Sequence, residues 1–315
     1  MALLDALTGA ILPVLAIAGT GFLLGWFRDV PVDPLATVTI YVLTPALVFS
    51  SLATSDLGGR AIAKVGAGVA AFTLLMIAVA AAATRLTGDP EGVRGAAMLT
   101  STFPNAGNYG IPLAAFAFGS VGRSTAVLYV SAQAVFMYTV GVYLASRGEA
   151  TSPIAALREV FRLPLVYAVA AAGGARLLDV VPAASSSLMQ TVSLTGDAAI
   201  PVMLLVLGLQ LADAAETTGL ARVHTAVGLK LLIAPVVALG LAIALQFEAA
   251  TVARVFVLEC SMPTAVTTLL LTVEFSEDGG RAPAPTYASS AIFVTTLLSV
   301  VTLTVLVSLL QNGLV

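Results

Sequence analysis

Long apolar segments alternate with short polar ones along the whole chain. Each apolar segment approaches or exceeds the roughly 20 residues that an α-helix needs to span a bilayer. The longest polar connection, 146–162, is too short to form a domain of its own. The pattern therefore predicts an all-α fold with ten transmembrane helices, at 4–27, 33–53, 61–84, 94–118, 122–146, 160–179, 184–212, 220–246, 250–273 and 284–311.

Composition places the chain in a lipid bilayer. Of 315 residues, 59% are hydrophobic and 10% are charged, and the mean hydropathy is +1.02. Soluble domains carry about 25% charged residues. The single Cys260 excludes an internal disulfide and a cysteine-rich metal site. Since no HExxH or GxSxG pattern occurs, we expect neither an enzyme nor a bound cofactor, and the net charge of −3 gives no indication of nucleic-acid binding.

The two halves of the chain resemble each other. Leu-Pro pairs begin the first helix of each half at 12–13 and 163–164, Pro45 matches Pro201, and Pro104 matches Pro263. The three offsets are 151, 156 and 159 residues. We therefore expect a first repeat at 1–146, a cytoplasmic connection at 147–159 and a second repeat at 160–315. Because each repeat has five helices, the second enters the membrane the opposite way round, as in many secondary transporters.

The basic residues predict the orientation. Nine lie in or near the loops after helices one, three, five, seven and nine, and five lie on the opposite side. Cytoplasmic loops are enriched in Lys and Arg, so we expect the first set to be cytoplasmic and both termini to be extracellular. The first set is Arg28, Arg85, Arg94, Arg147, Arg158, Arg162, Arg222, Lys230 and Arg281, and the second is Arg60, Lys64, Arg123, Arg176 and Arg254.

Helix-breaking residues interrupt the fourth and ninth apolar segments. The fourth contains TFPNAGNYGIPL at 102–113, and the ninth contains ECSMPTAVTT at 259–268. Non-helical backbone at membrane depth is tolerated only where it is buried in protein or lines a watery cavity. A single break is compatible with a simple proline kink. Breaks at matching places in two inverted halves favour a binding site.

Four motifs carry a resemblance to a known family. They are PNAGNYGIPLA, IPVMLLVLGLQLAD, LKLLIAPVVAL and CSMPTAVTTLLLTVEF, in helices four, seven, eight and nine. The chain resembles the auxin efflux carrier family, whose bacterial and archaeal members include dicarboxylate carriers, over essentially all ten helices. The family's fold is similar to that of the sodium/bile acid symporters. The resemblance implies discontinuous helices four and nine that cross at their breaks, a homodimer, and a crossover domain that moves against a scaffold domain, each built from both repeats.

Two positions depart from the family pattern. Thr267 stands where the family often has Asn, and Lys64 is alone in helix three, where the plant carriers use an acid and a lysine. These departures speak against auxin itself and leave an anion carrier as the interpretation.

The crossed arrangement predicts an anion site. The second half-helices begin near Asn105 and Thr264, and a helix N-terminus offers free N–H groups and positive partial charge. Asn105 and Asn108 are the strongest candidates for direct contact with a carboxylate, whereas Tyr109 serves equally well in packing. The full set of expected substrate-site residues is Pro104, Asn105, Asn108, Tyr109, Pro263, Thr264 and Thr267.

Ionisable residues inside the membrane are candidates for ion coupling. Glu259 lies just before the second break, where it could ligate sodium together with Met262 or carry a proton. The sodium/bile acid symporters have a sodium-ligating glutamate at the similar place, where many auxin-carrier relatives have glutamine. Glu259 and Asp197 are the expected coupling residues, with a structural glutamate and a helix-capping aspartate as the alternatives. Lys230 is interpreted as snorkelling to the membrane surface, with a functional role as the alternative.

The sequence thus predicts a multi-pass plasma-membrane carrier for a small organic anion such as a mono- or dicarboxylate, working by alternating access. A sodium-coupled symporter of bile-acid type is the alternative, followed by a passive anion channel. The lipid bilayer, the substrate and a second copy of the chain are the expected partners, and Na⁺ or H⁺ is the expected coupling ion.

Overall fold

The computed structural model describes residues 2–146, 153–217, 223–274 and 283–315, in which every regular element is a helix. These ranges leave out residues 147–152 of the predicted connection, which include Arg147. They also leave out Arg222 and Arg281. The helices are α1 (Ala2–Ala6), η1 (Leu7–Ile11), α2 (Leu12–Phe27), α3 (Val32–Val38), η2 (Thr39–Leu43), α4 (Thr44–Ala53), α5 (Gly59–Leu86), α6 (Glu91–Thr102), η3 (Ala106–Gly110), α7 (Ile111–Phe136), η4 (Met137–Gly141), α8 (Val142–Ala145), α9 (Pro153–Arg162), α10 (Pro164–Leu177), α11 (Ser187–Asp197), α12 (Ala199–Thr217), α13 (His224–Gly228), η5 (Leu229–Ile233), α14 (Ala234–Leu245), α15 (Ala250–Cys260), α16 (Thr267–Glu274) and α17 (Pro283–Gln311).

Seven continuous helices in the described ranges are long and apolar enough to cross a membrane. Their outer surfaces carry large apolar side chains, which suits contact with lipid rather than water. Tyr41, Leu74, Leu232, Val236, Leu297 and Val301 are examples of such exposed side chains. The seven helices are Leu3–Phe27, Val32–Ala53, Gly59–Leu86, Ala106–Ala145, Ser187–Ala215, His224–Leu245 and Pro283–Gln311.

The helix Ala106–Ala145 contains one non-helical residue, Gly119, with φ 64° and ψ −147°. This left-handed conformation favours glycine, which has no Cβ. The predicted boundary between two spans at 118–122 falls on this residue. The chain therefore turns from one helical segment into the next through a single residue rather than through a loop.

Four prolines lie shortly after widened, π-helical turns. Pro13, Pro45, Pro112 and Pro235 each lie two residues beyond the end of a π-helix, namely η1, η2, η3 and η5. Proline cannot donate a backbone hydrogen bond, and its ring clashes with the carbonyl four residues earlier. A π-turn shifts the hydrogen-bond register by one residue, so these spans continue past their prolines.

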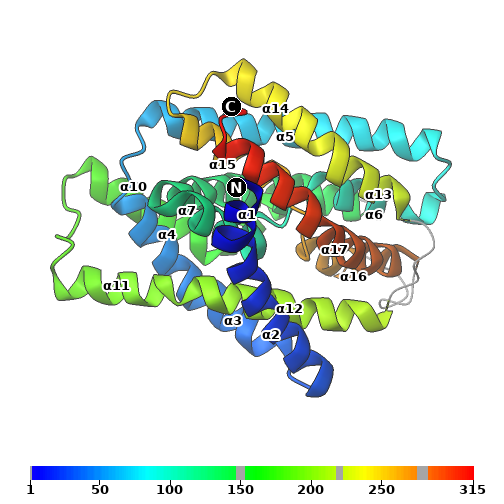
Figure 1. The fold of residues 1–315 in the computed structure, drawn as a ribbon, viewed down its shortest axis with the longest axis horizontal. Helices are drawn as coiled ribbons and strands as arrows, with labels where there is room; N and C mark the ends of the chain where they lie inside the picture. Colours follow the sequence, from blue (N-terminus) through cyan, green and yellow to red (C-terminus); the bar gives the residue numbers. More distant parts are fainter. Residues whose placement is uncertain (1, 147–152, 218–222, 275–282) are drawn as a thin grey trace.

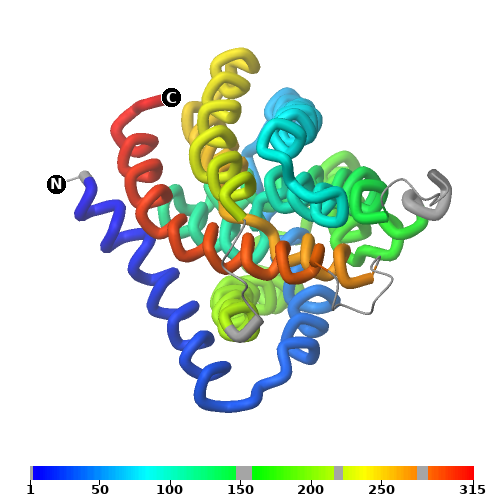
Figure 2. The backbone as a smooth tube through the Cα atoms, turned by 90° about the vertical axis from the view of Figure 1, so that its right-hand side faces the viewer, coloured from blue at the N-terminus to red at the C-terminus, as the bar shows by residue number. Residues whose placement is uncertain are grey.

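The helices pack in two groups. In one, α2 packs along α12, and α4 packs against α10 and α11. In the other, α6 packs against α5 and α17, and α15 packs against α7 and α14. Figure 2 shows α17 crossing the middle of the molecule, with α5 and α14 above it and α12 below it.

The first group is held by backbone contact between α2 and α12. A methyl group at Gly208 would collide with the backbone of Ala18 and Phe22, and one at Gly21 would collide with the backbone of Leu205. Small residues at these positions let two membrane helices approach closely.

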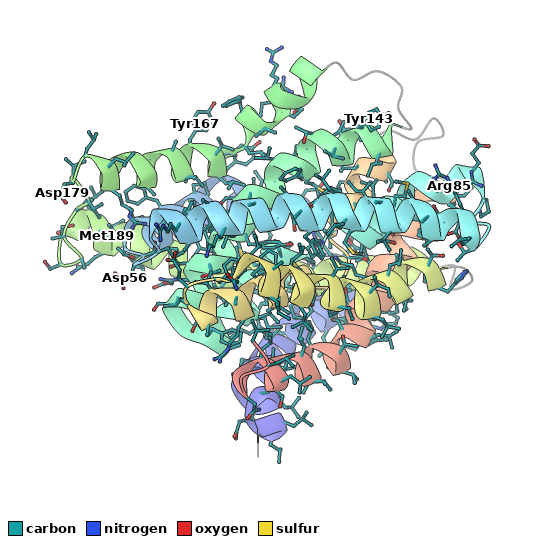
Figure 3. All side chains as sticks on the ribbon, turned by 90° about the horizontal axis from the view of Figure 1, so that it is seen from above. Asp56, Arg85, Tyr143, Tyr167, Asp179 and Met189 are labelled. Atoms are coloured by element: carbon teal, nitrogen blue, oxygen red, sulfur yellow. The ribbon has the colours of Figure 1, made fainter. Side chains whose placement is uncertain are left out.

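Polar residues gather at the two ends of the long axis. α4 and α10 end on the left of Figure 1, whereas α5, α12 and α16 end on the right. Figure 3 places Asp56 and Asp179 at one end and Arg85 at the other. The helix α5 alone has 28 residues, about 42 Å of helix, which is more than the hydrocarbon thickness of a bilayer.

Candidate functional site

Two helices stop inside the bundle and restart after a short extended segment. α6 ends at Thr102 and η3 begins at Ala106, while α15 ends at Cys260 and α16 begins at Thr267. Pro104 and Pro263 lie inside these two gaps. Each proline lacks an N–H and disfavours helical geometry at the residue before it. The local chemistry of both segments therefore interrupts the helix where the sequence predicts a break.

The two interrupted segments pair with each other. Pro104 and Thr264 form an antiparallel bridge, in which the backbone N–H of Asn105 donates to the Pro263 carbonyl at 2.7 Å. The backbone N–H of Ala265 donates to the Phe103 carbonyl at 3.0 Å. Each segment thus supplies the partners that the other lost with its helix, which satisfies backbone groups that would be costly to bury unpaired.

Side chains from neighbouring helices hold this pair in place. Thr264 donates its hydroxyl to the Thr100 carbonyl at 2.9 Å, and its backbone N–H donates to the Thr295 Oγ1 atom at 3.1 Å. Gln133 donates its Nε2 to the Pro104 carbonyl at 3.0 Å. Thr264 is fully buried, so it serves the pairing and not a surface.

A cavity of about 230 Å³ adjoins the paired segments. It lies between them and the group of helices that contains α3, η2 and α12. Of the residues expected at a substrate site, Pro104, Asn105, Asn108 and Thr267 line it. The other polar side chains in its wall are Thr39, Thr44, Gln133, Tyr138 and Gln210.

Most of the cavity wall is apolar, with several polar side chains and, among the described residues, no charged one. Two helix starts contribute to it, through Gly107 and Asn108 on one side and Val266 and Thr267 on the other. The first N–H groups of a helix have no partner within that helix and carry positive partial charge. In the part of the chain that the structure describes, three side-chain atoms of the wall also lack a hydrogen-bond partner, namely Asn105 Nδ2, Gln133 Oε1 and Gln210 Oε1.

Glu259 lies on another side of the paired segments. Its side chain is fully buried, and neither carboxyl oxygen has a hydrogen-bond partner among the described residues. The carboxyl group packs directly against Gly110 of η3, where an added methyl group would collide with it. Met262, three residues later, is also fully buried, and its N–H donates to the Glu259 carbonyl at 3.3 Å. Burying a carboxylate without a donor or cation is costly, so this position suits a bound cation or a proton.

Known proteins resemble this chain along almost its full length. The model of a family described as membrane transport protein matches residues 6–159 and 152–307. The chain belongs to this family. A protein of Methanothermobacter thermautotrophicus, described as an uncharacterized transporter, is 29% identical over 302 residues, which cover 94% of this chain and 96% of that protein. These matches confirm the auxin efflux carrier family that the helix motifs indicate, and with the apolar helices they identify a multi-pass membrane transporter.

The remaining expected site residues lie elsewhere in the transporter. Pro263 accepts the bond from Asn105 and does not line the cavity. Tyr109 is buried on the opposite side of η3, where it lines a second, apolar cavity of about 370 Å³ together with Leu207 and Phe293. Asp197 ends α11 on the protein surface, where its carboxylate pairs with Arg123 at 2.6 Å. The negative charge of Asp197 is therefore met by a guanidinium in this arrangement.

Gln133 and Thr295, which bond to the paired segments, went unrecognised in the sequence. Gln133 is a lone amide in an apolar span. Polar residues inside a membrane usually have a function or a specific partner, so its position could have been noticed in the sequence. Thr295 carries no such signal, because threonine is common in membrane helices and bonds to its own helix, as it also does here through the Ala291 carbonyl. Lys230 was interpreted as snorkelling, and this is wrong: its side chain is fully buried.

Proposed function

We propose that the chain is a secondary carrier for a small organic anion, with the substrate bound in the cavity beside the paired interrupted segments. The single observation that carries the proposal is that two helix starts and Asn105, whose buried Nδ2 has no partner among the described residues, line one cavity without a charged side chain in its described wall. Free N–H groups at helix starts bind carboxylates without a basic side chain. An uncharged site also releases its substrate more readily than one with a buried arginine.

The size of the cavity favours a small mono- or dicarboxylate. Its volume of about 230 Å³ corresponds to roughly seven or eight water molecules. Drug-sized ligands need about 300–1,000 Å³. A compact carboxylate with Asn105, Asn108 and Thr267 around it fits this space, and Pro104 forms part of the wall.

Alternating access explains why the cavity lies between two groups of helices. The paired segments belong to the group with α5, α6, α15 and α17, and the opposite wall comes from α3, η2 and α12. We assign these groups to a crossover domain and a scaffold domain, in a fold of ten spans and two inverted repeats. A movement of one group past the other, as in an elevator, exposes the cavity first to one side of the membrane and then to the other. We place the carrier in the plasma membrane as a homodimer with extracellular termini.

Coupling to a cation is the second part of the proposal, and Glu259 carries it. The buried carboxyl group has no partner in the described ranges, and Met262 lies at the same helix end. A sodium ion held by Glu259 and nearby carbonyls, or a proton on Glu259, removes the cost of the buried charge. Asp197 is a weaker candidate because Arg123 already neutralises it.

Thermal unfolding of the purified protein tests the substrate. The screen compares small mono- and dicarboxylates with matched neutral amides and esters, each in sodium chloride and in choline chloride. A carboxylate that binds the native state raises the melting temperature in a saturable way. Uptake into proteoliposomes then separates the carrier from a channel, since carrier flux saturates with substrate concentration. Stabilisation by no carboxylate, or flux that rises linearly without limit, would reject the proposal.

A further inference from the structure

Lys230 is a basic residue buried inside the bundle of membrane-spanning helices. It belongs to the π-helix η5 within the continuous span His224–Leu245. Its side chain has no exposed surface. No carboxylate lies within 4 Å of it among the described residues, because the ion pairs there involve Arg60, Arg123 and Arg162 only.

The Lys230 Nζ atom lies at the end of α6. It donates a hydrogen bond to the carbonyl of Thr102, the last residue of that helix, at 3.3 Å. It also lies over the face of the Phe72 ring, 5.6 Å from the ring centroid. A carbonyl at a helix C-terminus and an aromatic face both attract a cation.

Neutral donors bond to other carbonyls at this interruption. The carbonyls of Thr100, Phe103 and Pro104 accept bonds from the Thr264 hydroxyl, the Ala265 N–H and the Gln133 amide. The Thr102 carbonyl is the one that receives a charged donor. An ammonium group has three donors, and Lys230 makes one long hydrogen bond in the described structure. The position of the ammonium group at the helix end therefore suits an electrostatic role better than a hydrogen-bonding role.

The two interrupted helices thus end differently. α6 ends at a buried cation, whereas α15 ends beside the buried, unpartnered carboxyl of Glu259. Carbonyls freed at a helix C-terminus inside a membrane are the groups that coordinate monovalent cations in transporters with discontinuous helices. At α6 a side chain of the protein itself takes that position.

We propose that the C-terminal end of α6 is a monovalent-cation site, and that Lys230 occupies it permanently with its own ammonium group. The end of α6 then needs no dissolved ion. Given the cation coupling proposed for Glu259, a free coupling cation binds at the end of α15 only.

Replacement of Lys230 by alanine and addition of a free amine tests the proposal. Lys230→Ala removes Cγ, Cδ, Cε and Nζ, which are the four heavy atoms of propylammonium. The readout is the melting temperature of the detergent-solubilised protein in propylammonium, methylammonium, sodium or choline chloride. It needs no substrate, so it remains decisive even if no carboxylate binds.

We expect propylammonium to stabilise Lys230→Ala selectively and saturably. The shift should be about 1–2 °C at a few times the dissociation constant. The wild type and Lys230→Met, which keeps the length of the chain without the charge, should show no difference between propylammonium and choline. Lys64→Ala is the matched control. Lys64 donates to the Gln246 carbonyl just beyond the end of α14 at 2.6 Å, but at the protein surface.

An equal response of Lys230→Ala to propylammonium and to choline would overturn the cation site. If Lys230→Ala does not fold without additives, recovery of folded protein in propylammonium but not in choline supports the proposal. If it folds in neither, Lys230→Arg and Lys230→Met decide. A melting temperature near that of the wild type for Lys230→Arg and clearly lower for Lys230→Met supports the site, and a value for Lys230→Met equal to or above that of Lys230→Arg rejects it.

Discussion

Asn105 donates its backbone N–H to the carbonyl of Pro263 across 2.7 Å, although 158 positions separate the two residues in the sequence. This bond uses the backbone of Asn105 and leaves its Nδ2 without a partner among the described residues. One residue therefore fixes the geometry of the interruption, lines the cavity and keeps a buried donor without a partner. The structural and the proposed binding roles of Asn105 can be separated by substitution, because alanine keeps the backbone bond.

Alanine at Asn105 or Asn108 should weaken substrate binding more than folding. A hydrogen bond to a charged group contributes about 1.5–3 kcal/mol, so the KM for uptake should rise about tenfold or more. The melting temperature without substrate should change little. Asn312→Ala is the control, since Asn312 lies in the C-terminal turn and bonds to the Ser308 carbonyl. Unchanged uptake kinetics in either variant would remove that asparagine from the site.

Glu259→Gln should disconnect uptake from a cation gradient. Glutamine keeps the shape and hydrogen-bonding capacity of the side chain but cannot carry the charge. In proteoliposomes, the response of uptake to a sodium or proton gradient should disappear, while substrate exchange persists. Glu248→Gln provides a matched control, because Glu248 is exposed and lies 3.9 Å from Arg60. The coupling role fails if wild-type uptake ignores both gradients, or if the Glu259→Gln protein still responds to one.

Gly110→Ala should disturb the contact between η3 and α15. The added methyl group would meet the Glu259 carboxyl group, and overpacking of this kind costs about 1–3 kcal/mol of stability. Gly66→Ala on α5 is the comparison, since nothing lies within 4 Å of its added methyl group and alanine favours helix by about 0.5–1 kcal/mol.

A double-mutant cycle with Glu259→Ala sharpens the same experiment. The shorter side chain makes room, so Gly110→Ala should cost less in that background. Equal melting temperatures for the Gly110→Ala and Gly66→Ala proteins would show that the carboxyl group does not occupy this position.

The orientation of the chain can be tested by cysteine labelling. In a Cys260→Ala background, a membrane-impermeant maleimide added from outside should label Gly313→Cys and not Ser152→Cys. Permeabilised cells should label both and serve as the control. The opposite pattern in intact cells would reverse the topology and contradict the inverted-repeat interpretation.

The sequence predicts where the two helices are interrupted better than it predicts which residues bond to the interrupted segments. Pro104 lies among asparagines and glycines and Pro263 among serine and threonine residues, so both gaps were predictable from the local residue types, whereas other spans continue past their prolines. The partners of the freed backbone groups lie on other helices, as Gln133, Thr295 and Lys230 do. No spacing along the chain determines which helices will be neighbours.

For charged residues inside the membrane, the sequence was a poor predictor of whether the side chain is buried or exposed. Lys230 and Lys64 are the two lysines of the chain, and both lie inside predicted spans, Lys64 three residues after the start of 61–84 and Lys230 ten residues after the start of 220–246. One caps a surface helix end and the other is enclosed in the bundle. The difference depends on the π-turn and on the packing of η5 against α6, which hydropathy does not encode. The ends of long helices, by contrast, followed from composition, since α5 and α17 begin and end within two residues of the predicted spans.

Gly119 determines how rigidly the two parts of the helix Ala106–Ala145 are joined. A loop of several residues would let the helix that starts at Ala106 tilt independently of the one that follows. Here the joint is a single residue at φ 64°, and Gly122 packs directly against the Ala114 carbonyl. The two helical segments therefore have little freedom to move relative to each other. A displacement of α7 therefore also moves Asn105 and Asn108 in the cavity wall. We expect the cavity wall to be carried through the membrane as an undeformed unit, and a longer linker inserted at Gly119 to slow transport while leaving affinity intact.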